Sequence, residues 1–201
     1  HREYIERSEK GFGESAFHAM WWKLLLEFKP ENLLEIGVYR GQVVSLWTLI
    51  GKLVHRKTNV YGISPFTSFG DSVSEYMKNL DYYQDVQSTF DELNLEKPTF
   101  VREFSNAEVA VDLVKSKTWD MIYIDGGHDY KDVLFDYKLC LENLNIGGII
   151  ILDDASLHTD YKPESFSFAG HYGPSKVARE FADKEMNFIG AVGHNNIYMK
   201  R

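Results

Sequence analysis

Short apolar segments rich in Ile, Val and Leu alternate with helical segments along the chain, and this alternation constrains the fold more than any other feature. Residues 119–125 (WDMIYID) and 147–154 (GGIIILDD) are the most apolar of these segments. Runs without polar alternation are typical of strands covered on both faces, as in a parallel sheet between two helical layers. The sequence therefore predicts an α/β fold with helices on both faces of its sheet.

Hydrophobic periodicity and breaker residues give the expected boundaries. We expect strands at 32–37, 59–63, 99–102, 119–125, 147–154, 187–192 and 195–199, and helices at 13–28, 41–54, 106–115, 131–143 and 174–184. The last two strands are close enough to form a hairpin, so we expect a doubly wound, mostly parallel sheet of about seven strands with the last one antiparallel. Residues 66–83 are expected to form a long connection over the ligand edge. No linker divides the chain, which indicates a single domain, 1–201, with an N-terminal helical segment, 1–30, before the core, 31–201.

Composition and charge restrict the partners. The chain has 201 residues, the length of one domain, and its 22 basic and 30 acidic side chains give a formal net charge of −8. This balance argues against nucleic acid and against an anionic membrane surface as partners. No apolar run approaches the roughly 20 residues of a membrane span, and the single cysteine, Cys140, cannot form an internal disulfide. We expect a cytoplasmic protein that binds a small molecule.

A glycine-containing turn follows the first predicted strand. Glu35 lies near the end of that strand, and Gly37 and Gly41 precede the next predicted helix. In doubly wound folds ligands bind outside the carboxyl ends of the strands, where a glycine lets the backbone approach the ligand closely. The Gly-x-x-x-Gly spacing differs from the Gly-x-Gly-x-x-Gly pattern of dinucleotide-binding proteins, which disfavours a nicotinamide cofactor. The same glycines could instead simply form a tight strand-to-helix turn.

Three carboxylates follow two of the predicted strands. Asp125 ends one strand, and Asp153 and Asp154 end the next, a spacing that suits a single strand–helix–strand unit. Neighbouring parallel strands would gather all three at one edge, where like charges repel unless a cation joins them. Oxygen ligands of this kind favour Mg²⁺, Ca²⁺ or Mn²⁺ over Zn²⁺. Taken alone, Asp125 could instead cap the helix that follows it.

Together and in this order, residues 35–41 (EIGVYRG), 124–130 (IDGGHDY) and 147–154 resemble the class I S-adenosylmethionine-dependent methyltransferases. The likeness is greatest to the metal-dependent O-methyltransferases, including the branch that acts on sugars of antibiotics and on other secondary metabolites. Residues 173–181 (GPSKVAREF) resemble the segment that follows the metal carboxylates in that branch. The resemblance implies a Rossmann-like fold, S-adenosylmethionine as cofactor and a divalent cation such as Mg²⁺.

The resemblance also implies roles for individual residues. The cofactor would be bordered by Glu35, Gly37, Gly41, Ser64, Ser105 and Asp125, and the cation would be held by Asp125, Asp153 and Asp154. Ser64 departs from the family pattern, because family members usually carry an acidic residue there that holds both ribose hydroxyls. A neutral hydrogen bond from Ser64 would contribute about 1 kcal/mol, against about 2 kcal/mol for a charge-assisted one. Ser105, with Asn106, could alternatively cap the following helix.

A hydroxyl group is a poor nucleophile at neutral pH, so methyl transfer to it needs assistance. A cation could bind two neighbouring acceptor oxygens, lower the pKa of one and fix its line of attack. Asp125 and His128 are the candidate catalytic residues, with His128 the first choice as proton acceptor. His158 and His171 follow the carboxylate pair and are further candidates, although loop histidines are often only solvated. His194 is expected in a hairpin turn.

The sequence as a whole favours an S-adenosylmethionine-dependent O-methyltransferase that acts on a small hydroxylated metabolite, such as a sugar, a polyol or a phenolic compound, with a divalent cation. The alternative is a catalytically silent S-adenosylmethionine-binding or scaffold protein, which Ser64 favours. An oxidoreductase or a hydrolase is disfavoured because neither Gly-x-Gly-x-x-Gly nor Gly-x-Ser-x-Gly occurs. The helix at 13–28 is apolar enough to support a homo-oligomer.

Overall fold

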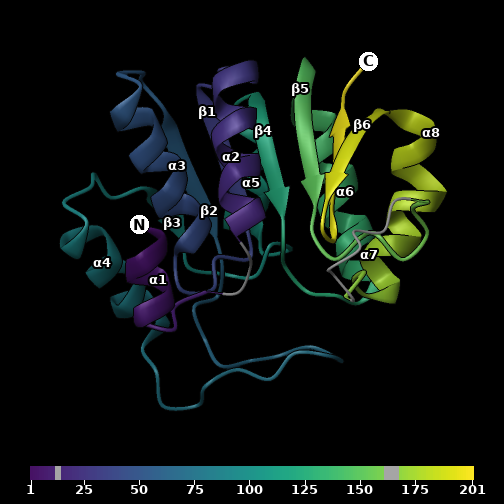
Figure 1. Cartoon of the computed structure of the whole chain (residues 1–201). Helices are drawn as coiled ribbons and strands as arrows, with labels where there is room; N and C mark the ends of the chain where they lie inside the picture. Colours follow the sequence, from purple (N-terminus) through teal and green to yellow (C-terminus); the bar gives the residue numbers. More distant parts are fainter. Residues whose placement is uncertain (12–14, 161–167) are drawn as a thin grey trace.

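The computed structural model describes residues 1–11, 15–160 and 168–201, and within these ranges it has a seven-stranded sheet with helices on both faces (Figure 1). The strands are β1 (Asn32–Ile36), β2 (Asn59–Ile63), β3 (Thr99–Val101), β4 (Trp119–Ile124), β5 (Leu144–Leu152), β6 (Asn187–Val192) and β7 (Asn195–Met199). Their order is β3-β2-β1-β4-β5-β7-β6, and β7 is antiparallel to both of its neighbours. The predicted α/β sheet with an antiparallel last strand is confirmed.

Helices cover both faces of this sheet. They are α1 (Arg2–Arg7), α2 (Ser15–Phe28), α3 (Gln42–Leu53), α4 (Tyr82–Glu92), α5 (Glu108–Lys115), α6 (Tyr130–Asn143), α7 (Tyr172–Val177) and α8 (Asp183–Glu185), with a π-helical turn at Ala178–Ala182. One buried apolar cluster joins α2, α3 and α4 to the sheet, and a second joins α5, α6 and α7 to it. These two layers make the fold doubly wound, as the sequence predicts. None of the described helices is long and apolar enough to span a membrane.

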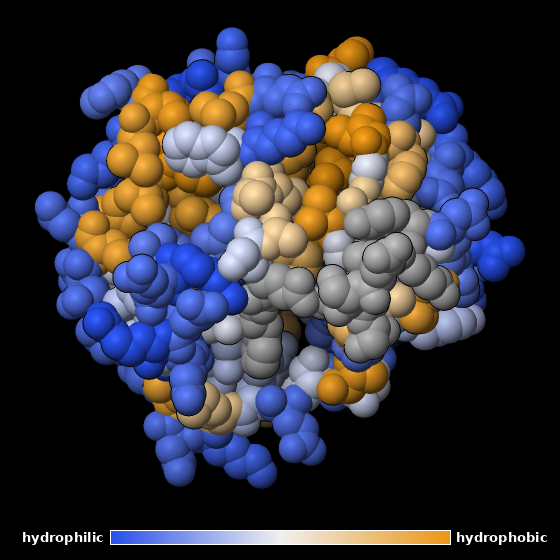
Figure 2. Space-filling model, viewed as in Figure 1, coloured by the Kyte–Doolittle hydropathy of each residue, from blue (hydrophilic) through white to orange (hydrophobic). Residues whose placement is uncertain are grey.

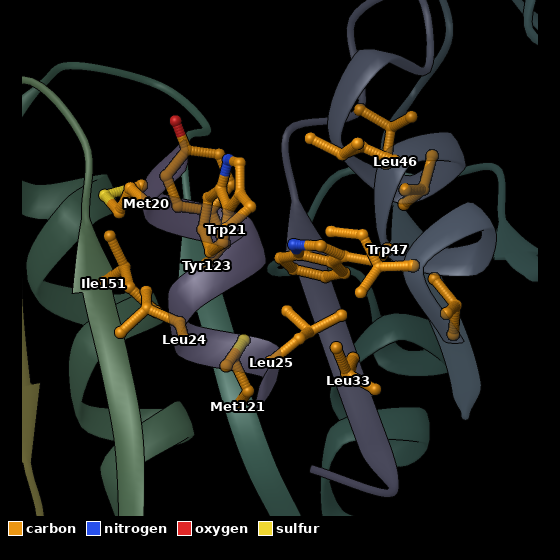
Figure 3. Close-up of a cluster of buried hydrophobic side chains, with 14 of the residues drawn as sticks. Met20, Trp21, Leu24, Leu25, Leu33, Leu46, Trp47, Met121, Tyr123 and Ile151 are labelled. Atoms are coloured by element: carbon orange, nitrogen blue, oxygen red, sulfur yellow. The ribbon is translucent and has the colours of Figure 1, made fainter. Parts of the chain in front are cut away.

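Trp21 anchors α2 on the sheet. Its ring packs edge-on against Trp47 of α3 and Tyr123 of β4, with ring centroids 5.1 and 5.0 Å apart (Figure 3). Met20 and Leu24 lie beside Trp21 in the same buried cluster. Aromatic pairs of this geometry add about 0.5–1.5 kcal/mol each beyond the area that they bury. The N-terminal helical segment is therefore packed into the same core as the sheet.

The apolar face of α2 packs into the core of the protein. Phe17, Trp21 and Leu25 are buried, whereas Trp22 and Leu26 are 43% and 38% exposed. On the face seen in Figure 2, hydrophobic areas are separated by hydrophilic surface. Pairing of two chains through this helix stays a prediction, and less apolar surface is available for it than the sequence indicates. The predicted first residue of the helix, at position 13, lies outside the described residues.

Three elements differ from the sequence prediction. Helix α4 was not expected, although its outer residues are polar and its apolar face, with Val86 and Phe90, has helical spacing. Strand β5 begins at Leu144 rather than at Gly147, because α6 passes into it without a loop. The helix expected at 174–184 is interrupted by the π-helical turn.

Candidate active site

The carboxyl ends of four parallel strands meet at one rim of the sheet. Gly37 follows β1, Ser64 follows β2, Asp125 follows β4 and Asp153 follows β5. Backbone hydrogen bonds continue into this rim, since the N–H groups of Asp125 and Asp153 donate to the last residues of β1 and β4 at 2.8 and 3.0 Å. The strand order thus brings together residues that are far apart in the chain.

A cavity of about 1020 Å³ opens at this rim. Small-molecule sites are usually about 300–1,000 Å³, so the cavity has room for a cofactor together with an acceptor. Residues 64–67, 69–71 and 73–76, from the long connection after β2, line it, and that connection extends beneath the strand ends in Figure 1. Most of the predicted site residues also line it: Glu35, Gly37, Ser64, Ser105, Asp125, His128, Asp153 and Asp154.

The two glycines of the first turn are required for different reasons. Gly37 has φ = 96°, and a Cβ atom there would overlap the backbone carbonyl of Asp125. The close approach of the β1 and β4 ends therefore requires Gly37, which also borders the cavity. Gly41 has φ = 85° and directly precedes α3, but it is not among the described residues that line the cavity. Its left-handed conformation turns the chain into the helix.

Glu35 is buried beneath this turn. Its Oε2 atom accepts a hydrogen bond of 3.1 Å from the N–H group of Val44, in the first turn of α3. Burial raises the pKa of Glu35 to about 8, against the effect of this hydrogen bond, and the charge of Asp153 adds to the rise. The carboxyl group is therefore largely protonated at neutral pH in the ligand-free protein.

Asp125 and Asp153 form a hydrogen-bonded carboxyl pair. Burial and then the charge of Asp153 raise the pKa of Asp125 well above its usual value, and burial and the charge of Asp154 raise the pKa of Asp153. Two carboxyl groups in contact in a buried site do not both ionise, so the pair shares a proton. Among the described residues, no donor hydrogen-bonds to the buried Oδ1 atom of Asp153. A divalent cation fits this donor set, because it would neutralise both carboxylates and bind an Asp153 oxygen that accepts no hydrogen bond from the described residues.

His128 lies between two carboxylates from different segments. Its Nδ1 atom is 2.7 Å from Oδ2 of Asp71, and its Nε2 atom is 3.0 Å from Oδ2 of Asp154. Burial alone would lower the pKa of His128, but the hydrogen bond to Asp154 and the charges of both carboxylates raise it to about 9. The pKa of Asp71 is lowered to about 2. Burial alone would raise it, but hydrogen bonds from the N–H groups of His128 and Val73 and the charge of His128 lower it further. His128 is therefore positively charged at neutral pH in this state and cannot accept a further proton.

Two more histidines approach the same carboxylates. The Nε2 atom of His171 is 3.4 Å from Oδ2 of Asp154, and the Nε2 atom of His194 is 3.3 Å from Oδ1 of Asp153. The ring of Phe168 packs edge-on against both imidazoles, at 5.2 and 5.3 Å between centroids. His194 occupies the predicted turn between β6 and β7, but its ring also reaches the site.

The described residues contain two groups of donors that could hold a cation, each with its ligand atoms within 4.8 Å of one another. One group is His128, Asp154 and His171, and the other is Asp153, Asp154 and His194. Asp125 belongs to neither group, although it contacts Asp153. His158 is exposed and also belongs to neither.

Ser64 and Ser105 also line the cavity. Ser64 is buried, and its N–H group donates to the carbonyl of Val101 at 3.1 Å. Ser105 hydrogen-bonds to the buried carboxyl group of Asp136 on α6, whose pKa burial raises to about 7. The N-cap of α5 is Ala107, so neither Ser105 nor its neighbour caps that helix.

Sequence reasoning missed Asp71, and it did not connect His194 with the site. Asp71 lies in the long connection after β2, where its carboxylate accepts hydrogen bonds from Val73 and Ser74 at 3.0 and 2.9 Å as well as from His128. An Asp followed by small polar residues signals a local turn. Nothing in the sequence indicates that the turn meets His128, because that contact depends on how the connection folds back over the sheet.

The strand order, the glycine turn after β1 and the acidic rim after β4 and β5 define the chain as a class I S-adenosylmethionine-dependent methyltransferase. A family model described as a methyltransferase domain matches residues 34–155, which is more than half of the chain. The chain therefore belongs to this methyltransferase family. A search of curated protein sequences gives no match.

Solved structures share this fold at low sequence identity. The O-methyltransferase NovP has a TM-score of 0.67 and 14% identity, over 92% of this chain and 79% of that one. The SAH-bound methyltransferase PaMTH1 from Podospora anserina has a TM-score of 0.64 and 13% identity, over 100% and 84%. An O-methyltransferase from Bacillus cereus, in complex with SAH, has a TM-score of 0.63 and 13% identity, over 98% and 88%. At these identities the likeness establishes the fold alone.

Proposed function

We propose that the protein transfers a methyl group from S-adenosylmethionine to a hydroxyl group of a small metabolite, such as a sugar, a polyol or a phenolic compound, with the help of a divalent cation. The observation that carries this proposal is the rim, where Asp125, Asp153 and Asp154 border the same cavity as the glycine turn. The O-methyltransferases among the similar folds support the acceptor class. A cytoplasmic setting and a homo-oligomer are further parts of the proposal.

The cofactor would occupy the side of the cavity at β1 and β2. Gly37, Ser64 and Ser105 line this side, with Glu35 buried beneath it. Glu35 would ionise when the positively charged sulfonium cofactor binds nearby, because an opposite charge lowers the pKa of a buried carboxyl group. Gly41 would act indirectly, because its backbone conformation sets where α3 begins.

Mg²⁺ suits the carboxylates of Asp125, Asp153 and Asp154, because all of them offer hard oxygen ligands. When bound, such a cation would supply the positive charge that lowers the pKa of an acceptor hydroxyl. Of the two candidate catalytic residues, we assign the acceptor proton to Asp125, because His128 already carries a proton between Asp71 and Asp154. His128 would hold Asp154 and the connection after β2 in place, and it could accept a proton only after losing its own.

Apolar side chains shape the remaining part of the cavity. Phe17 and Trp21 of α2 and Phe168 line it beside the carboxylates. These rings would exclude water from the reacting atoms and pack against the carbon skeleton of the acceptor. Transfer then depends mainly on holding the two reactants in line, which can contribute several kcal/mol to lowering the barrier.

The double variant Asp153→Asn with Asp154→Asn tests this proposal. We expect methyl transfer to a panel of diols and catechols to fall by at least about 100-fold, because removing charge stabilisation at a reacting oxygen costs about that much. Calorimetry should find the affinity for S-adenosylmethionine within a few-fold of wild type. Asp112→Asn, on the exposed face of α5, is the matched control and should retain full activity. Full activity in the double variant would contradict the role of the rim.

A catalytically silent S-adenosylmethionine-binding protein is the second candidate, and Ser64 favours it. A serine at the end of β2 gives the ribose hydroxyls a weaker partner than a carboxylate would. Cofactor binding without cation-dependent turnover on any acceptor of the panel would support this candidate over the first.

A further inference from the structure

Three donor atoms converge at a point beside the carboxylate pair, and the proposed methyl transfer does not use them together. They are Nε2 of His128, Oδ2 of Asp154 and Nε2 of His171, which lie within 4.8 Å of one another. Their side chains are 11%, 9% and 28% exposed, so they form a largely enclosed group rather than a solvated surface cluster. All three residues line the cavity, which leaves the remaining side of the group open to a ligand.

The spacing of these atoms matches that of ligands around one ion. The Nε2 atom of His128 is 3.0 Å and that of His171 is 3.4 Å from the same Asp154 oxygen. Around a transition-metal ion with bonds of about 2.0–2.2 Å, neighbouring ligand atoms are about 3.0–3.6 Å apart. These two distances are therefore those of ligands around one ion, and the two imidazole nitrogens lie within 4.8 Å of each other.

A second carboxylate orients the first imidazole. Nδ1 of His128 is 2.7 Å from Asp71, which leaves Nε2 to face Asp154 and His171. Metal-binding histidines almost always make such a contact through the nitrogen that does not bind the ion. Asp71 also accepts the backbone N–H of His128 at 2.6 Å, so ring and backbone are held together.

The backbone holds the other two ligands in register. Ala155 and Gly170 form a β-bridge, and the N–H group of His171 donates to the carbonyl of Asp154 at 2.9 Å. Asp154 itself has φ = 52°, in the left-handed region that Asp adopts more readily than most residues. The rings of His128 and His171 pack edge-on at 4.6 Å between centroids.

We propose that His128, Asp154 and His171 form a second cation site, which takes a first-row transition ion such as Zn²⁺, Co²⁺ or Fe²⁺. Two imidazole nitrogens and one carboxylate suit these ions, whereas Mg²⁺ prefers oxygen ligands and retains its waters. Three protein ligands with an open side resemble catalytic rather than structural metal sites. This site goes beyond the proposed methyl transfer. With its Nε2 atom bound to an ion, His128 is a ligand, and Asp125 remains as the proton acceptor.

Cobalt titration of the full chain tests the proposal. The chelator-treated protein is titrated with Co²⁺; the visible absorption of the bound ion reports affinity and coordination geometry, and histidine variants identify the ligands. We expect one Co²⁺ to bind with imidazole ligands and to resist displacement by a hundredfold excess of Mg²⁺. His171→Gln should weaken Co²⁺ binding at least tenfold. His158→Gln, in the exposed part of the same connection, is the control and should change it less than twofold.

Two outcomes would overturn the proposal. One is Co²⁺ binding that is unchanged in His171→Gln and in His128→Gln, in proteins whose melting temperatures show that they fold. The other is weakening by His194→Gln alone, which would put the ion at Asp153 and Asp154 instead. Methyl transfer assayed with Mg²⁺ alone reports on the proposed function and not on this site, so either can fail while the other stands.

Discussion

Gly37 serves the fold and the candidate site at once. From the sequence, Gly37 was expected to let a ligand approach the backbone closely. The structure gives a second reason, since a Cβ atom would overlap the carbonyl of Asp125 on the neighbouring strand end. The residue is therefore fixed by the packing of β1 against β4 even before a ligand binds.

Gly37→Ala should destabilise the protein by about 2–4 kcal/mol, because the left-handed backbone and the overlap with Asp125 both act against a side chain. Urea unfolding of the ligand-free protein measures the change. Gly147→Ala is the matched control, since Gly147 has φ = 77° but nothing within 4 Å of an added Cβ atom. The control should lose only about 1 kcal/mol. Equal losses in the two variants would mean that the contact with Asp125 is unimportant.

At the scale of elements, buried ion pairs attach the N-terminal segment to α4. The Nζ atom of Lys10 and the Nε atom of Arg40 lie 3.1 and 2.7 Å from the carboxylate of Asp85, and all three side chains are largely buried. Arg40 also donates to the carbonyl of Glu9 at 2.7 Å. Lys10 and Gly11 line the cavity, so these ion pairs and this hydrogen bond hold one of its walls in place.

Asp85→Asn should release this segment and destabilise the protein by about 3 kcal/mol, because it leaves two buried cations without their counter-charge. Hydrogen exchange at residues 2–11 and urea unfolding measure both effects. Lys10 and Arg40 lower the pKa of Asp85 against the effect of burial, so its contribution is present above the unfolded pKa and is lost as acid protonates it. Asp91→Asn removes an exposed pair with Lys97 and should cost less than about 1 kcal/mol. Unchanged exchange in Asp85→Asn would contradict this attachment.

At the scale of the whole molecule, buried acids make stability depend on pH. Burial raises the pKa of Glu35 to about 8 and that of Asp136 to about 7. The folded protein keeps protons that the unfolded chain releases above about pH 4–5, so the free energy of unfolding falls as pH rises toward 8. Burial of these two carboxyl groups therefore lowers the stability of the protein at neutral pH.

Glu35→Gln should therefore stabilise the ligand-free protein by about 3 kcal/mol at pH 7 and change little below pH 4.5, since one pKa unit corresponds to about 1.4 kcal/mol. The amide can still accept the hydrogen bond from Val44. Urea unfolding across pH 4.5–8 measures the profile. A variant whose profile parallels that of wild type would show that Glu35 is not a source of the pH dependence.

Much of the fold could be predicted from the sequence, because its signals are local. The bounds of β2, β6 and β7 agree with the predicted ranges, since apolar runs with turn residues between them identify strands without reference to tertiary contacts. Helix α4 was missed, although its sequence carries an N-cap, Asp81, and apolar residues at helical spacing, Tyr82, Val86 and Phe90. The expected strand–helix–strand unit also places Asp125 and Asp153 at the same rim.

The sequence by itself determined the layered α/β architecture and the carboxylates that end its strands, since both follow from periodicity and from the geometry of parallel sheets. Only the tertiary structure decided which side chains surround those carboxylates. Asp71 and His194 come from two connections whose paths depend on long-range packing, and no local pattern records where such segments meet. His171 was already a candidate from the sequence, because it follows the carboxylate pair. The chemical character of the site, carboxylate with imidazole, was therefore set by the packing of the connections over the sheet.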